Sequence, residues 1–184
     1  MTTTRKAIGS HESASTGSDT WLTPRWVLDA LGPFDLDPCA APDPDRWPTA
    51  DVHYSLPADG LALPWNGRVW CNPPYSKVWR WLDRLATHNE GTALVFARTE
   101  TAGFQSQVWG RASAVLFISG RLTFHYASGA AARANSGAPS CLVAYGLDDA
   151  IRLANCGIPG AFVSQWKRPA APLESALTLE GIGT

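Results

Sequence analysis

The sequence predicts an α/β fold whose sheet is mixed and has an antiparallel end, and three observations lead to this prediction. Short apolar segments of strand length alternate with segments in which apolar residues recur at helical spacing. The apolar segments that end at residues 37, 71 and 97 are each followed by polar or proline residues, as at the carboxyl ends of neighbouring parallel strands. Two further apolar segments, residues 114–118 and 140–145, supply later strands, and we expect the sheet to have an antiparallel end.

We expect one globular domain over residues 19–166. The chain of 184 residues is 45% hydrophobic and 17% charged, so it can bury a core. Residues 1–18 are rich in Ser, Thr and Gly without periodicity, which indicates a flexible N-terminal arm, and residues 167–184 are expected to form a C-terminal tail. The net charge of −1 argues against a protein that coats nucleic acid, although it allows an enzyme with a local basic face.

Composition also indicates the cellular compartment of the protein and whether it binds a metal ion. No apolar run approaches the roughly 18 residues of a membrane span, and the first residues lack the apolar core of a signal peptide, so we expect a cytoplasmic protein. The four cysteines, Cys39, Cys71, Cys141 and Cys156, lie far apart without a CxxC pair, which predicts reduced thiols and neither a metal site nor a disulfide framework. Most of the nine tryptophans are expected in the core or in a pocket wall.

The first predicted helix spans residues 23–31. Thr23 is the expected N-cap, Pro24 the first helical residue, and Gly32-Pro33 the end of the helix. Its predicted apolar face is formed by Trp26, Val27, Ala30 and Leu31. A short strand over residues 34–38 then runs into a turn.

Residues 42–50 contain too many prolines for the usual crossover helix, so we expect a loop, followed by a brief second strand over residues 51–54. Asp43 and Asp45 in this loop either hold the ribose of a nucleotide or are solvated, and solvation is the simpler interpretation.

Helical spacing returns after the third strand. Ser76 is the expected cap of a helix whose buried face is Val78, Trp81, Leu82 and Leu85. Lys77, Arg80 and Arg84 contact either phosphates or solvent from another face. Further helices are predicted over residues 102–110 and after Gly146, and a last strand near Phe162 and Val163.

The strand of residues 69–71 ends in the tetrapeptide Asn72-Pro73-Pro74-Tyr75, the most informative segment of the chain. The two prolines fix φ and remove two N–H donors, so the strand stops in a rigid tip rich in acceptors. These acceptors are the Asn72 side-chain oxygen and the carbonyls of Asn72 and Pro73, beside the Tyr75 ring. Such a tip suits a planar base with an exocyclic amine, because two oxygens can hold both N–H groups while tyrosine stacks on the ring.

Two other interpretations of the tetrapeptide were weighed. It could be a polyproline ligand for an aromatic groove, but the common ligand has a residue between the second proline and the tyrosine, and this chain has none. It could also be an ordinary turn that ends a strand.

The tetrapeptide resembles the catalytic tetrapeptide of amino-methyltransferases, and the chain over about residues 19–146 resembles the phage-type DNA N-6-adenine methyltransferases. The segments that carry this wider resemblance are Trp21-Leu22-Thr23-Pro24, Phe34-Asp35-Leu36-Asp37-Pro38-Cys39-Ala40, Asp59-Gly60-Leu61 with Pro64-Trp65, the tetrapeptide, Ala97-Arg98-Thr99-Glu100-Thr101, and Gly120-Arg121-Leu122-Thr123-Phe124. The resemblance implies a Rossmann-like class I methyltransferase fold, S-adenosylmethionine as the cofactor, and transfer of its methyl group to the N-6 amine of adenine in the DNA of a bacterial host cell. We expect a monomer or a weak dimer.

The resemblance also implies roles for individual residues. The catalytic residues are Asn72, Pro73, Pro74 and Tyr75. The cofactor-binding residues are Trp21, Thr23, Pro24, Asp37, Pro38, Cys39, Ala40 and Asp59. The chain departs from the general methyltransferase pattern after Asp37, where a Gly-x-Gly loop is usual and Cys39-Ala40-Ala41-Pro42 stands instead.

DNA contacts are predicted at the same edge of the sheet. Arg98 follows the strand of residues 92–97 and is interpreted as a DNA or structural contact. The loop of residues 125–139 is long for a compact domain, and it offers His125, Arg133 and Asn135 as candidate readers of bases. The target amine lies inside a duplex, so the base must be flipped out or already unpaired.

Two rival functions stay open on sequence alone. One is methylation of the cytosine amine or of an RNA or protein amide, although enzymes that act on cytosine usually carry serine where this chain has Asn72. The other is a catalytically inactive methyltransferase fold that binds DNA or protein, which the mild acidity and the missing Gly-x-Gly loop favour and the intact tetrapeptide opposes.

Overall fold

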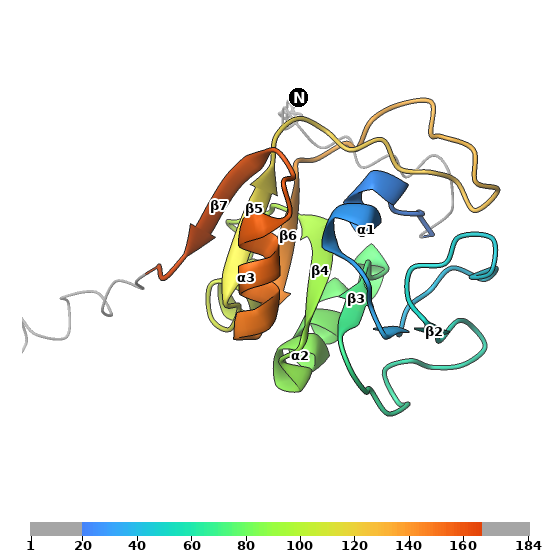
Figure 1. The fold of residues 1–184 in the computed structure, drawn as a ribbon, viewed down its shortest axis with the longest axis horizontal. Helices are drawn as coiled ribbons and strands as arrows, with labels where there is room; N and C mark the ends of the chain where they lie inside the picture. Colours follow the sequence, from blue (N-terminus) through green and yellow to red (C-terminus); the bar gives the residue numbers. More distant parts are fainter. Residues whose placement is uncertain (1–19, 167–184) are drawn as a thin grey trace, which may run out of the picture.

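The computed structural model describes residues 20–166, so the predicted arm of residues 1–18 and tail of residues 167–184 lie outside the described residues. Helical elements are interspersed among the strands along the chain (Figure 1). The elements are α1 (Arg25–Leu31), β1 (Leu36–Asp37), β2 (Val52–His53), β3 (Val69–Cys71), η1 (Tyr75–Lys77), α2 (Val78–His88), β4 (Gly91–Phe96), η2 (Phe104–Val108), β5 (Ala114–Ile118), β6 (Ser140–Tyr145), α3 (Leu147–Asn155) and β7 (Gly160–Ser164).

Within the described residues, the strands form one sheet of 7 strands in the order β2-β1-β3-β4-β6-β5-β7. Strands β2, β1, β3 and β4 are parallel, whereas β6 pairs antiparallel with both β4 and β5, and β7 pairs antiparallel with β5. The predicted mixed sheet with an antiparallel end is therefore confirmed. The longest pairing joins β4 to β6 in the register Gly91↔Tyr145 to Phe96↔Ser140.

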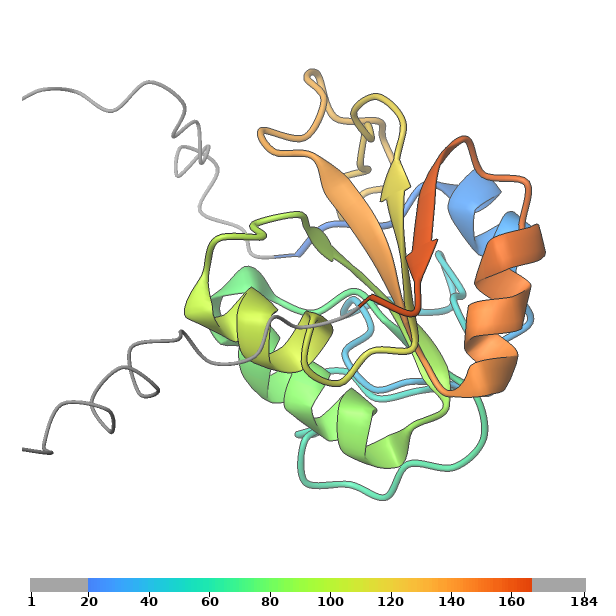
Figure 2. The same cartoon turned by 90° about the vertical axis from the view of Figure 1, so that its left-hand side faces the viewer.

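Helices cover both faces of this sheet (Figure 2). On one face, α1 and α3 pack on Trp70, Leu94 and Leu142, which point to that side from β3, β4 and β6. On the other face, α2 and η2 pack on residues that alternate with these, such as Cys71, Val95 and Val143. Because successive strand residues point to opposite faces, strands buried on both sides read as continuous apolar runs, as the sequence shows.

The order of the strands places a reversal beside β1. The chain steps from β1 outward to β2 and then crosses back to β3 on the other side of β1. In open α/β sheets, ligands bind outside the carboxyl ends of the strands at such a reversal. Here those ends are Asp37 on β1 and Cys71 on β3, so the tetrapeptide begins at the predicted place.

A buried ion pair fastens the strand that carries the tetrapeptide. Arg68, directly before β3, donates to the Asp149 carboxylate of α3 at 2.8 Å, and the two side chains are 8% and 1% exposed. The same guanidinium donates to the carbonyls of Leu31 and Pro33 at 2.7 Å, and Thr92 donates to Asp149 at 3.0 Å. Sequence analysis missed this pair, because its partners lie far apart in the chain.

The prediction for the first helix is wrong in two details. The helix begins one residue later than expected, with Pro24 at the N-cap in an extended conformation (ψ 135), and no side chain caps it. Trp26 is 47% exposed, and Leu28 is buried in its place. Val27, Leu28 and Leu31 lie on one side of this short helix, and Trp26 lies outside that stripe.

The predicted cap of the second helix is also wrong. A single 3₁₀ turn, η1, begins at Tyr75, the last residue of the tetrapeptide, so α2 begins at Val78 with Lys77 at its N-cap and without a side-chain cap. The predicted helix over residues 102–110 is present, but Phe104–Val108 is wound as a π-helix.

Among the described helices, none combines the length and apolar character that crossing a membrane requires. Residues 20–166 also contain no cluster of three or more His, Cys, Asp or Glu side chains that could hold a metal ion.

Candidate active site

The Asn72 side chain is held by the segment before α1. Its amide nitrogen donates to the main-chain carbonyl of Trp21 at 2.9 Å and to the Thr23 hydroxyl at 3.2 Å. A carbonyl oxygen can only accept, so the contact with Trp21 requires the nitrogen of the amide and not its oxygen at this point. The Asn72 side-chain oxygen therefore points away from Trp21, and it receives no hydrogen bond from residues 20–166.

The residues after Asn72 form a rigid turn with an aromatic wall. Pro74 is extended (φ −59, ψ 130), and its carbonyl accepts from the Lys77 N–H at 3.1 Å, which starts η1. The Tyr75 ring stacks on Phe96, the last residue of β4, with ring centres 4.2 Å apart and planes 12° from parallel. One face of Tyr75 is thus covered, so a base can stack only on the opposite face.

The end of β1 lies directly beside the tetrapeptide. The Cys39 and Cys71 sulfurs are 3.7 Å apart, which places the Asp37–Ala40 segment against the residue that precedes Asn72. Asp37 is 3% exposed and accepts from the Thr49 hydroxyl at 2.5 Å and from the Cys39 N–H at 3.0 Å. Burial raises the pKa of the Asp37 carboxyl above its ordinary value, and the two hydrogen bonds oppose this rise.

The loop that contains Asp59 packs on the same segment. Gly60 lies so close to Pro38 that an added Cβ would stand 1.8 Å from the Pro38 carbonyl oxygen. The Trp65 indole N–H donates to the Gly60 carbonyl at 2.8 Å. Asp59 is exposed, and one of its carboxylate oxygens accepts from the Leu61 N–H at 3.0 Å. The structure therefore brings Asp59 beside Pro38, although these residues are distant in sequence.

Arg84 has a role that sequence analysis did not assign. Its guanidinium donates to the carbonyls of Leu61 and Leu63 and lies over the Trp65 ring, 4.8 Å from the ring centre. Neither predicted environment, phosphate or solvent, applies to this half-buried side chain. Arg84 instead fastens the loop after Asp59 to α2. The expectation that Asp43 and Asp45 are solvated agrees with their exposure.

The loop of residues 125–139 meets the Trp21–Thr23 segment at His125. Leu22 and His125 exchange two backbone hydrogen bonds, of 2.9 and 3.0 Å. Trp47 contacts both of these segments. Its indole N–H donates to the Thr23 carbonyl at 2.8 Å, and the centre of its ring lies 4.8 Å from that of the His125 ring. Nothing in the sequence pattern singled out Trp47 from the other tryptophans.

Comparison with known proteins gives the family. Residues 10–149 match the family model described as DNA N-6-adenine-methyltransferase (Dam). The chain belongs to this family. A curated relative, the DNA N-6-adenine-methyltransferase of Escherichia phage T1, is 30% identical over 115 residues, which cover 57% of this chain and 47% of the relative. The chain thus matches about half the length of that relative, and no solved structure matches it significantly.

In this Dam-family protein the residues predicted to contact DNA lie on two separate segments, the end of β4 and the loop of residues 125–139. Arg98 is half-buried just beyond β4, at the same edge of the sheet as Asn72. Arg133 and Asn135 are exposed on the loop of residues 125–139, which passes over that edge (Figure 2). Of the four predicted DNA contacts, His125 pairs with Leu22 in the Trp21–Thr23 segment.

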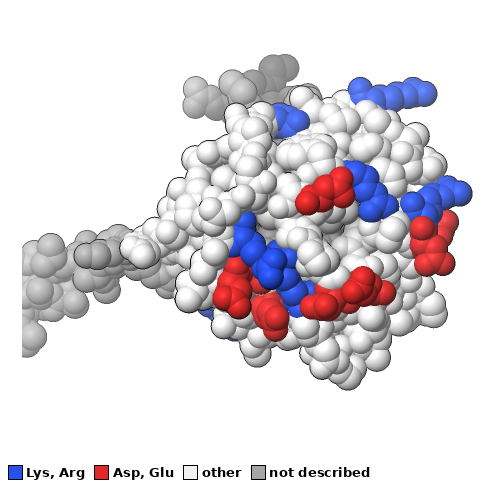
Figure 3. Space-filling model, in the orientation of Figure 1, with Lys and Arg blue, Asp and Glu red and all other residues white. Residues whose placement is uncertain are grey.

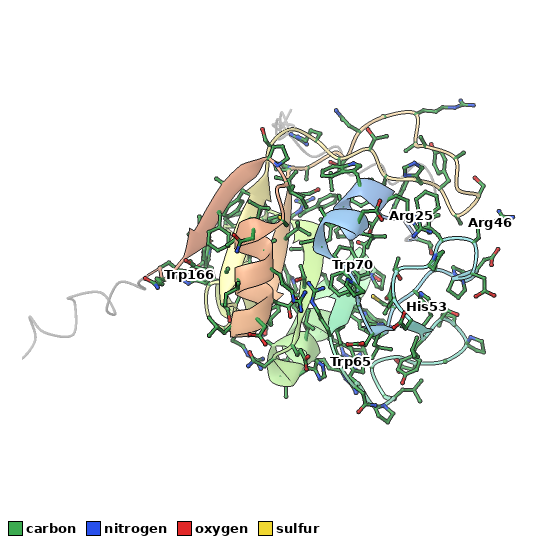
Figure 4. The ribbon with its side chains drawn as sticks, in the orientation of Figure 1. Arg25, Arg46, His53, Trp65, Trp70 and Trp166 are labelled. Carbon is green, nitrogen blue, oxygen red and sulfur yellow. The ribbon has the colours of Figure 1, made fainter. Side chains whose placement is uncertain are left out.

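The charge around this loop favours an anionic partner. Between Arg111 and Asp148 the chain contains no Asp or Glu. Arg25 and Arg46 lie on the side of the molecule next to the loop (Figure 4), and Arg46 donates to the Ser128 carbonyl at 3.4 Å. On the face shown in Figure 3, basic side chains stand along the upper edge, whereas the acidic ones lie lower and are mixed with basic ones.

Two hollows of the described residues are lined by no residue of the tetrapeptide. One, of about 410 Å³, is lined by Asp35, Leu36, Val52, Tyr54, Asn66 and Gly67. The other, of about 400 Å³, is lined by Leu61, Trp79, Arg80, Asp83 and Arg84. The second hollow adjoins the loop that Arg84 fastens, so it borders the Asp59 segment and not the tetrapeptide.

Proposed function

We propose that this protein transfers the methyl group of S-adenosylmethionine to the N-6 amine of adenine in DNA, on a Rossmann-like class I methyltransferase fold. The observation that carries the proposal is the orientation of the Asn72 amide, whose nitrogen is bound by Trp21 and Thr23 while its oxygen points away from them. That oxygen is an acceptor at the carboxyl end of a strand beside the reversal of the sheet. The membership of the family supports the same activity.

The residues around this edge fit the proposed cofactor. The Asp37–Ala40 segment ends β1 at the reversal, where doubly wound folds bind nucleotides. Gly60, the residue after exposed Asp59, packs on this segment, and carboxylates accept from the exocyclic amine of an adenine. We assign the cofactor to these residues together with Trp21, Pro24 and the main chain of Thr23, whose hydroxyl is occupied by Asn72. S-adenosylmethionine, when bound, supplies an electrophilic methyl carbon on a sulfonium sulfur.

The tetrapeptide then prepares the acceptor amine. In our mechanism, the Asn72 side-chain oxygen and the Pro73 carbonyl each accept one N–H of the adenine amine, and Pro74 keeps both acceptors rigid. These bonds favour a tetrahedral nitrogen whose lone pair is available, so no strong base is needed. As the N–C bond forms and the C–S bond breaks, positive charge grows on the amine. The two oxygens stabilise that charge until one proton passes to water.

The target base must leave the DNA stack to reach this tip. The Tyr75 ring, which Phe96 covers on one face, is assigned to stacking on the flipped base. We assign Arg98, His125 and Arg133 to the contacts with the DNA around the flipped base. Those of these contacts that reach phosphates give affinity without specifying the sequence, whereas contacts of the loop with base edges determine the recognition site. With DNA as partner we keep the prediction of a cytoplasmic protein.

The test compares the wild-type protein with Asn72→Ala. The full chain is incubated with S-adenosylmethionine carrying a labelled methyl group and with unmethylated duplex and single-stranded DNA, and the digested nucleosides are identified by mass spectrometry. We expect N-6-methyladenine from the wild type, none from Asn72→Ala, and nearly equal cofactor affinity by calorimetry. Asn155→Ala, at an exposed position on α3, is the matched control and should behave as wild type.

Three outcomes would contradict the proposal in different ways. Methylated cytosine in place of adenine would favour the rival activity. A wild-type protein without affinity for millimolar S-adenosylmethionine would indicate a binding module. Equal loss of cofactor binding and methyl transfer in Asn72→Ala would mean that Asn72 is structural.

A further inference from the structure

We propose that Thr23 and the main-chain carbonyl of Trp21 are positioning groups for the catalytic amide, and that Trp47 and the loop at His125 hold these groups in place. The inference rests on the proposed function, because that function gives Asn72 its substrate. In this inference the Thr23 hydroxyl binds the Asn72 amide and does not cap a helix as predicted. The positioning of Asn72 by this hydroxyl is a role distinct from cofactor binding.

The first step concerns the two orientations of an amide. Rotation of the Asn72 amide by half a turn would exchange its oxygen and its nitrogen. The amine of adenine donates two N–H groups and is a poor acceptor, so a nitrogen turned toward it makes no productive hydrogen bond. Only the orientation with the oxygen toward the amine can support catalysis.

Trp21 and Thr23 act differently on this choice. The Trp21 carbonyl lies 2.9 Å from the Asn72 nitrogen, and the rotated amide would set two acceptor oxygens against each other there. The Thr23 hydroxyl, 3.2 Å from the same nitrogen, can accept from a nitrogen or donate to an oxygen. The carbonyl of Trp21 therefore selects the orientation, and Thr23 limits the motion of the selected amide by occupying its second N–H.

The second step concerns what holds the segment itself. Thr23 is 2% exposed and Leu22 is 5% exposed. Leu22, between the two positioning groups, is paired through both of its backbone polar groups with His125. The Thr23 carbonyl accepts from the Trp47 indole N–H at 2.8 Å, and the Trp47 ring rests against the His125 ring. Two separate parts of the chain thus fix the segment that orients Asn72.

This arrangement connects the predicted DNA-binding loop to the chemistry. The loop that carries exposed Arg133 begins at His125, and His125 holds the residue between Trp21 and Thr23. A change in the position of the loop therefore reaches the catalytic amide through one pair of backbone hydrogen bonds. Substitutions that loosen the segment should reduce kcat more than the affinity for either substrate.

The test uses Thr23→Val, which has nearly the same shape but no hydroxyl, and Thr23→Ser, which keeps the hydroxyl. We expect Thr23→Val to lower kcat roughly fivefold to tenfold, as the loss of one buried hydrogen bond allows, with both KM values within about twofold of wild type. Thr23→Ser should restore most of kcat. Thr87→Val, at an exposed threonine of α2, is the control for the chemical change.

A second variant acts on the segment from outside. Trp47→Phe keeps an aromatic ring against His125 but removes the N–H that binds the Thr23 carbonyl, and we expect it to lower kcat in the same direction as Thr23→Val. If Thr23→Val does not fold, Trp47→Phe decides the matter. An unchanged kcat in the folded variants, or a rise in the KM for S-adenosylmethionine without a fall in kcat, would overturn the positioning role.

A readout without turnover separates this inference from the proposed function. In wild-type protein, the NMR signals of the Asn72 side-chain amide should show slow hydrogen exchange, because both of its N–H groups are bonded. Thr23→Val should accelerate this exchange several-fold. If the wild-type protein has no methyltransferase activity but Thr23→Val accelerates the exchange of the Asn72 amide, the proposed function is refuted and the positioning role of Thr23 is supported. If the wild-type protein is an active methyltransferase but Thr23→Val leaves this exchange unchanged, the proposed function is supported and the positioning role of Thr23 is refuted.

Discussion

Replacement of Asn72 by aspartate tests the orientation of the catalytic amide most directly. The two side chains have nearly the same shape, but a carboxylate has no N–H and would set an oxygen 2.9 Å from the Trp21 carbonyl. One hydrogen bond of about 1 kcal/mol is lost, and a carbonyl without its partner costs about 1–3 kcal/mol more. Together these two terms give about 2–4 kcal/mol. If this free energy destabilises the orientation of residue 72 that supports catalysis, kcat decreases roughly 30-fold to 1000-fold, at about 1.4 kcal/mol for each factor of ten.

The assay measures kcat for methyl transfer to DNA, with cofactor affinity determined separately by calorimetry. Asn72→Asp should approach the inactivity of Asn72→Ala while its cofactor affinity stays close to wild type. Its residual activity should rise as the pH is lowered from about 8 to about 5.5, because a protonated carboxyl can donate to the Trp21 carbonyl. A kcat within threefold of wild type at neutral pH would refute the reasoning, since the amide nitrogen would then be unimportant.

Four further expectations concern the surroundings of Asn72. Gly60→Ala should raise the KM for S-adenosylmethionine about tenfold with little change in kcat, because a Cβ 1.8 Å from the Pro38 carbonyl must push the loop away, and an unchanged KM would separate that loop from the cofactor. Asp149→Ala leaves a buried guanidinium without its carboxylate and should lower the unfolding free energy in urea by about 3–5 kcal/mol, whereas Asp148→Ala, at the exposed neighbouring position, should change it little. Burial raises the pKa of the Asp37 carboxyl above its ordinary value of 3.8. The folded protein therefore binds the proton of this carboxyl more tightly than the unfolded chain does, and it loses stability as the pH rises above that value. Asp37→Asn should therefore gain unfolding free energy relative to wild type as the pH rises above about 4, and a difference in unfolding free energy that does not change with pH would contradict the raised pKa of Asp37. Arg133→Ala should weaken DNA binding and reduce its dependence on salt by about one ion, as titrations at several salt concentrations would measure.

Several features of the fold could be predicted from the sequence because they depend on local chemistry. The bounds of β5 and β6 agree with the apolar segments of residues 114–118 and 140–145. The proline-rich residues 42–50 form no helix, and the two prolines after Asn72 stop β3 as expected. Where the outcome depended on a choice between neighbouring residues, as at the start of α1, the sequence allowed more than one answer and the prediction was wrong.

The sequence by itself determined the tip of β3, since the two prolines after Asn72 end the strand and remove two backbone N–H donors, and it determined the family by the order of its motifs. Tertiary structure alone decided which side-chain atom of Asn72 is held and which is free, because the Trp21 carbonyl that makes this choice lies 51 residues away in the chain. Arg68 with Asp149, Arg84 with its two carbonyls, and Trp47 with Thr23 were decided in the same way. Each is a contact between segments that are brought together only when the sheet closes, so periodicity and local propensity contain no information about it.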